Sequence, residues 1–86
     1  MSNRLIDNPD VQKAYDTLGV ELLCRDNEKG YVFEVFMLKD ANLECYVYPE
    51  KKEWEKKFYA RSTRPVPWRD FLLYCETNYK KEGGSH

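Results

Sequence analysis

The spacing of apolar residues changes twice along the chain and divides it into helical and extended segments. Near the N-terminus the apolar residues recur at helical spacing, as Val11, Ala14, Tyr15 and Leu18. Asn8 is a favoured N-cap, Pro9 is favoured at the first helical position, and Gly19 suits a left-handed C-cap. The pattern therefore predicts a helix over residues 9–18.

From residue 20 the period falls to two, which is typical of strands. Four strands are predicted, at residues 20–24, 31–38, 43–48 and 53–62. The turns RDNEKG, KDAN and PEKK separate them, and such short connections favour antiparallel pairing of neighbours. The segment YVFEVFML at 31–38 is mostly apolar on both faces, so we expect it inside the sheet.

A second amphipathic helix is predicted after the extended segment RPVP at 64–67. Its apolar residues are Trp68, Phe71, Leu72, Cys75 and Tyr79, over about 14 residues. The order α-β-β-β-β-α predicts an α+β fold: a four-stranded antiparallel meander flanked by an N-terminal and a C-terminal helix. We expect one domain over residues 1–82, with 83–86 as a flexible or vector-derived tail.

The length of the apolar runs and the number of cysteines indicate the cellular compartment. No run approaches the ~20 apolar residues of a membrane span, and MSNRLIDNPD lacks the apolar region of a signal peptide. The three cysteines are odd in number and widely spaced. Cys24 and Cys45 fall on the first and third strands, ~9–10 Å apart, which is too far for a disulfide. We expect a cytoplasmic protein with free thiols.

The parts of common catalytic and metal sites are missing from the sequence. The single histidine is His86, so the folded domain has no imidazole for general base catalysis or zinc binding. The glycines form no phosphate-binding loop. Cys75 lies on an apolar helix face, where a buried, inert thiol is the stronger interpretation. We therefore expect no enzyme, no metal and no cofactor.

Basic residues are concentrated in one segment, residues 51–69, KKEWEKKFYARSTRPVPWR. This segment holds seven basic and two acidic side chains. The first fifty residues have five basic and ten acidic side chains, a net of -5, and the remainder nine and five, a net of +4. The chain as a whole has a net charge of only -1. One part of the surface should therefore differ electrically from the rest.

The first candidate site is a group of arginines at the start of the second helix, Arg61, Arg64 and Arg69. A phosphate or a partner's carboxylates would compensate their charge at the positive end of a helix dipole. The competing interpretation is that Asp70 and nearby glutamates pair with them while Ser62 or Thr63 caps a turn.

The second candidate is a sheet face on which aromatic and basic residues of adjacent strands would gather. Its members are Tyr46, Tyr48, Lys57, Tyr59 and Arg61. Such a face could stack nucleic-acid bases or serve as a protein-binding hot spot. Alternatively, the second helix covers it and the tyrosines belong to the core, since a register shift of one residue exchanges the two faces.

The third candidate is the second apolar face of residues 31–38. Two short helices need not cover both faces of a four-stranded sheet, so exposed Phe and Val side chains would mark self-association or a client protein. The alternative is one helix on each face.

Together these patterns favour a small non-catalytic protein-binding domain: an inhibitor, an adaptor or a subunit of a larger assembly. Its partner would be a protein with an acidic surface, with no membrane involved. The contact residues would be Tyr46, Tyr48, Trp54, Lys57, Tyr59, Arg61, Arg64 and Arg69. Single-stranded nucleic-acid binding by the same surface is the alternative, although the pI of about 5.8 counts against it. A homodimer formed through the sheet is a further possibility.

Overall fold

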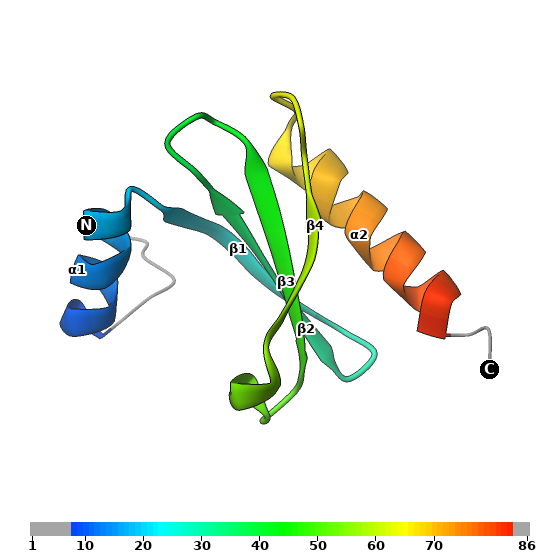
Figure 1. The fold of residues 1–86 in the computed structure, drawn as a ribbon. Coiled ribbons are helices and arrows are strands. Elements are labelled where there is room, and N and C mark those ends of the chain that lie inside the picture. Colours follow the sequence, from blue (N-terminus) through cyan, green and yellow to red (C-terminus); the bar gives the residue numbers. More distant parts are fainter. Residues whose placement is uncertain (1–7, 84–86) are drawn as a thin grey trace.

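A computed structural model describes residues 8–83 and confirms the predicted α+β fold (Figure 1). The elements are α1 (Pro9–Leu18), β1 (Glu21–Glu28), β2 (Tyr31–Met37), β3 (Leu43–Pro49), the 3-10 helix η1 (Glu53–Glu55), β4 (Lys57–Arg61) and α2 (Trp68–Gly83). Of the predicted tail at 83–86, Gly83 is the last residue of α2, and residues 84–86 lie outside the described residues.

The four strands form one antiparallel sheet in the order β1-β2-β3-β4. Val35 at the centre of β2 pairs with Cys24 of β1 and with Cys45 of β3. The register shifts once in β1, between Leu22 and Cys24, and once where β3 meets β4. β2 and β3 are therefore the inner strands, and β1 and β4 are the edges.

The hydrophobic core lies between α2 and one face of the sheet. Its buried members are Phe33, Val35, Leu43, Cys45, Val47, Phe71 and Cys75. The predicted apolar stripe of α2 supplies Phe71 and Cys75, and Trp68, Leu72 and Tyr79 pack against the same cluster. We call the opposite side of the sheet, away from α2, the far face.

α1 lies on the far side of the sheet from α2 (Figure 1). Its ends form as the sequence predicts: the Asn8 side chain accepts hydrogen bonds from the first-turn amides, and Gly19 is left-handed with φ 73°. Its ring contact with the sheet joins Tyr15 to Phe36, with ring centroids 5.4 Å apart. No residue of α1 is buried.

Two of the predicted boundaries are wrong. β1 continues through Glu28, and the turn that follows contains only Lys29 and Gly30, both at positive φ (52° and 84°). A two-residue turn of this kind matches the twist of a hairpin, so the polar residues before it stay paired with β2. The predicted strand at 53–62 begins late, because residues 53–55 form η1 and β4 spans only Lys57–Arg61.

The cysteines are free, as predicted: Cys24 is half-buried, and Cys45 and Cys75 are buried. Within residues 8–83, no helix is long and apolar enough to cross a membrane.

Candidate protein-binding surface

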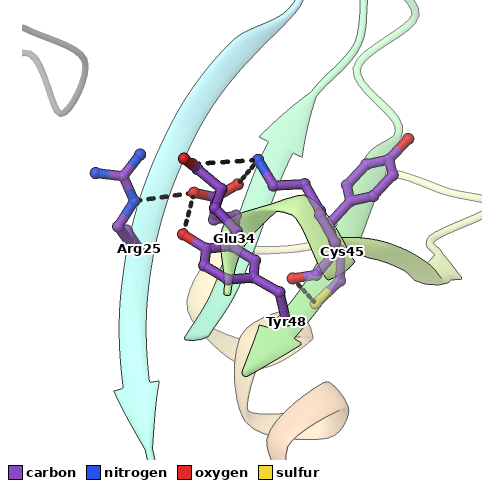
Figure 2. A network of polar contacts seen from close by, with 7 residues as sticks. Arg25, Glu34, Cys45 and Tyr48 are labelled. Carbon is purple, nitrogen blue, oxygen red and sulfur yellow. Dashed lines mark hydrogen bonds and ion pairs between the residues drawn. The ribbon is translucent and has the colours of Figure 1, made fainter. Parts of the chain in front are cut away.

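A buried carboxylate organises the far face of the sheet. Glu34 lies at the centre of β2, is 1% exposed, and points away from α2. Three side chains contact it: Arg25 with Nε at 2.9 Å, Lys56 with Nζ at 2.6 Å, and Tyr48 with its hydroxyl at 3.0 Å (Figure 2). A buried charge needs such partners, because it has lost its hydration.

The partners keep this carboxylate ionised. Burial by itself raises the pKa of Glu34, but hydrogen bonds from Lys56, Arg25 and Tyr48 outweigh it and hold the pKa below the ordinary value. The same contact acts oppositely on the phenol, where burial and the hydrogen bond to Glu34 raise the pKa of Tyr48 to about 12. Glu53 also lies 3.9 Å from the Lys56 ammonium, so two carboxylates face the two cations of this cluster.

Lys56 connects the buried cluster to the segment between β3 and β4. It directly follows η1, and its ammonium lies 5.3 Å from the centroid of the Tyr48 ring and 6.0 Å from that of Phe36. Backbone hydrogen bonds order the rest of the segment: Lys52 N–H donates to Pro49, Glu55 N–H to Lys52, and Lys56 N–H to Glu53, at 2.9–3.0 Å. The segment is therefore held at both ends.

This ordered segment presents a large aromatic side chain to solvent. Trp54, the middle residue of η1, is 78% exposed, more than any other large apolar side chain among residues 8–83. Lys51, Lys52 and Lys57 beside it are also exposed. We call residues 50–57 the Trp54 turn.

Four rings cross the far face from α1 to β4. Tyr15, Phe36, Tyr46 and Phe58 follow one another edge to face, with centroids 5.4–5.6 Å apart. Phe36 is buried at the centre of this ladder, whereas Phe58 on the edge strand is 54% exposed. Apolar surface is therefore open at the β4 end of the far face.

The tyrosines and Arg61 of the predicted aromatic-basic face do not form one surface. Tyr48 is buried in the Glu34 cluster. Tyr46 lies on the far face, and its hydroxyl donates to Glu44, the same carboxylate that pairs with Arg61. Tyr59 instead contacts Tyr79 of α2, with centroids 5.3 Å apart, on the core side.

The irregular pairing of β3 with β4 explains this separation. Tyr46 pairs with Phe58, but the preceding Cys45 pairs with Ala60, so Tyr59 is the extra residue of a bulge. The bulge turns Tyr59 toward α2. Tyr46 and Tyr59 therefore do not lie side by side on one face of the sheet.

The remaining predicted residues divide between two ends of β4. Trp54 and Lys57 lie at its start, whereas Arg64 and Arg69 lie beyond its end, where the chain enters α2 (Figure 1). There the Ser62 hydroxyl donates to the carbonyl of Arg64, and the guanidinium of Arg69 lies 5.1 Å from the centroid of the Trp68 ring. Arg64 is exposed.

Glu34 and the anchoring role of Lys56 were missed by the sequence interpretation. The available signal was a single carboxylate in the otherwise apolar run YVFEVFM of β2. An acidic residue at the centre of an inner strand requires cationic partners on neighbouring segments. Arg25 is one partner because it pairs with Glu34 across β1 and β2, and Lys56 reaches Glu34 from the Trp54 turn.

Among the side chains that the structure describes, no group of three or more His, Cys, Asp or Glu is arranged to hold a metal ion. Compared with known proteins, the chain matches no protein-family model, no curated protein and no solved structure.

Proposed function

We propose that this protein is a small non-catalytic protein-binding domain of the cytoplasm, which binds an acidic surface of another protein through the Trp54 turn. The observation that carries the proposal is the 78% exposure of Trp54 on a segment that is internally ordered. Tryptophan is the side chain most enriched at binding hot spots, and its exposure in water is unfavourable unless a partner covers it.

The anchored geometry supports a binding role. A loop that is already ordered loses less conformational entropy when it binds. The ion pair from Lys56 to Glu34 and the backbone hydrogen bonds of η1 restrict the turn before any partner arrives. Trp54 can then act as an apolar anchor whose position is set by the sheet.

The charges around the anchor favour an acidic partner. Among the described residues, no ion pair involves Lys51, Lys52 or Lys57. Their ammonium groups are exposed at the rim of the proposed contact, where charge mainly speeds association and selects the partner. Glu50, Glu53 and Glu55 of the same turn are also exposed and equal these three lysines in number, so specificity should depend on how the partner's carboxylates are arranged opposite the lysines.

Affinity capture from a lysate of the producing cells tests the proposal. The bait is compared with a Lys51→Glu, Lys52→Glu variant and with a matched Lys29→Glu, Lys39→Glu control, whose lysines are also exposed but lie in other turns. We expect the wild type and the control to retain the same protein, with recovery reduced for the first variant and by added salt.

Each capture is repeated after nuclease treatment. Retention that survives nuclease supports a protein partner. Retention that disappears with nuclease and falls steeply with salt would instead support the nucleic-acid alternative. Equal recovery by both charge-reversed variants would show that the Trp54 turn is not the contact.

A further inference from the structure

A cavity of about 360 Å³ lies on the core side of the sheet, between the C-terminal half of α2 and the β1–β2 hairpin (Figure 1). Three rings line it, those of Tyr31 and Phe33 on β2 and of Tyr79 on α2. Tyr79 meets the other two edge to face, with centroids 5.3 Å and 5.5 Å away. Because Tyr31 is 38% exposed and Phe33 is buried, this aromatic wall leads from solvent toward the core.

Two carboxyl and two ammonium groups complete the lining, so it has no net charge when all four are ionised. They belong to Glu28, Glu76, Lys29 and Lys80. Among these four, the described ion pair joins Lys80 Nζ to Glu28 Oε1 at 3.8 Å, close to the longest distance at which such a pair acts. Mutual pairing therefore neutralises these charges only in part.

Like charges are neighbours within this balanced set. Hydrogen bonding and repulsion from Lys80 lower the pKa of Lys29. Burial, then hydrogen bonding and repulsion from Asp26, raise the pKa of Glu76. When both carboxyl groups are ionised, no donor reaches the buried Oε2 of Glu76. An anion beside the lysines and a cation beside the carboxyl groups would each relieve a repulsion.

We propose that this cavity binds a free α-amino acid with an aromatic side chain. The ligand's ammonium lies against Glu76, its carboxylate against Lys80 and Lys29, and its ring against the aromatic wall. Such a ligand has no net charge, like the lining, and it brings one charge of each sign.

The spacing on α2 fits this ligand. Glu76 and Lys80 are four residues apart and therefore lie on the same side of the helix, with ~5–6 Å between their Cβ atoms. The ammonium and the carboxylate of an α-amino acid are joined through a single carbon. With a hydrogen bond of ~2.8 Å at each end, they can span the two side chains. Tyr79 lies between these positions in the sequence and lines the same cavity.

This inference is independent of the proposed function, because no residue of the Trp54 turn lines the cavity. The two proposals can therefore fail separately. A ligand with the roughly twelve non-hydrogen atoms of phenylalanine should bind with a dissociation constant of about 1 mM or tighter.

Nuclear magnetic resonance titration of the full chain with L-phenylalanine tests the proposal, with the ring signals of Tyr31 and Tyr79 as the readout. Three comparison probes each lack one part of the ligand. Phenethylamine lacks the carboxylate, N-acetylphenylalaninamide lacks both charges, and glycine lacks the ring. We expect each to bind at least tenfold more weakly than L-phenylalanine. No shift of the ring signals up to about 20 mM L-phenylalanine, or equal affinity for phenethylamine or the amide, would overturn the proposal.

Two variants then test the charged contacts. Glu76→Gln and Lys80→Met should each weaken binding of L-phenylalanine about tenfold, because each removes one charge-assisted hydrogen bond. Glu21→Gln and Lys13→Met are the matched controls, since both residues are exposed and neither lines the cavity. Circular dichroism checks that all four are folded. Wild-type affinity in both cavity variants would overturn the proposal, as would an equal loss in the controls.

Discussion

The ammonium of Lys56 lies 2.6 Å from the buried Oε1 of Glu34, and this ion pair joins the centre of the sheet to the base of an exposed turn. Arg25 and Tyr48 complete the environment of the carboxylate. The ion pair with the sheet, together with the backbone hydrogen bonds of η1, therefore fixes where Trp54 is presented.

Neutralising the buried carboxylate should destabilise the protein. Glu34→Gln retains the shape but leaves the Arg25 and Lys56 cations without their counter-charge. Breaking a buried ion pair typically costs ~3–5 kcal/mol, and because both cations can turn partly toward water we expect a loss of about 2–3 kcal/mol in the free energy of unfolding. Urea denaturation measures it.

Glu44→Gln is the control for that substitution, because Glu44 pairs with the half-exposed Arg61. This variant should lose less than ~1 kcal/mol in the free energy of unfolding. Equal losses for the two variants would contradict the special role of Glu34.

The pKa of Glu34 is lower in the folded state than in the unfolded state. Its contribution is therefore complete above the unfolded pKa and is lost as the pH falls through the folded pKa.

Removing the ammonium of Lys56 should loosen the turn while the sheet stays intact. Lys56→Met keeps much of the apolar stem over Phe36 and Tyr48 but abolishes the ion pair with Glu34. We expect amide hydrogen exchange at Glu55 and at position 56, whose N–H groups close η1, to accelerate about tenfold. Lys57→Met should leave these rates unchanged; similar acceleration in both variants would count against anchoring by Lys56.

The carboxyl groups of Glu76 and Asp26 should make the protein less stable as the pH rises through neutrality. Burial, then hydrogen bonding and repulsion from Asp26, raise the pKa of Glu76 to about 7 from an ordinary 4.5. Between these values the folded state binds more protons than the unfolded state, so the free energy of unfolding decreases with pH. Glu76→Gln should remove this decrease.

Thermal unfolding of the wild type and Glu76→Gln at pH 5 and pH 8 measures the effect. The variant should be more stable than the wild type only at pH 8. The gain should be small, because water screens a group that is only partly buried. An unchanged difference at the two pH values would show that Glu76 does not retain its proton in the folded state.

The buried thiols should resist alkylation. Hydrogen bonding to Cys75 and burial raise the pKa of Cys45, and burial raises the pKa of Cys24 to about 11, so thiolate is scarce at neutral pH. Mass spectrometry after treatment with iodoacetamide should find at most one label on the native protein, at Cys24, and three in denaturant. Rapid triple labelling without denaturant would mean that α2 separates readily from the sheet.

The strongly periodic parts of the fold could be predicted from the sequence. Asn8 and Gly19 define α1, and the alternation from Tyr31 to Met37 defines β2, because local caps and side-chain periods determine these elements. The start of β4 could not be predicted in this way. Lysine and glutamate suit either an edge strand or a 3-10 turn, and a tertiary ion pair from Lys56 accompanies the turn.

The predicted site depended on strand register, which local pattern does not determine. The bulge at Tyr59 places Tyr46 and Tyr59 on opposite faces, although simple alternation from residue 53 had placed Tyr59 with Arg61. The exposure of Trp54 likewise follows from η1, since a strand would have directed its ring onto one face of the sheet.

The affinity of the captured partner for two truncation variants tests the central claim most directly. Trp54→Ala removes the anchor, and Leu73→Ala removes a similarly exposed side chain on α2. By titration calorimetry we expect Trp54→Ala to weaken binding by about 2 kcal/mol or more, roughly thirtyfold, with Leu73→Ala unchanged and both variants as stable as the wild type. Wild-type affinity for Trp54→Ala would contradict the claim that the Trp54 turn is the binding surface.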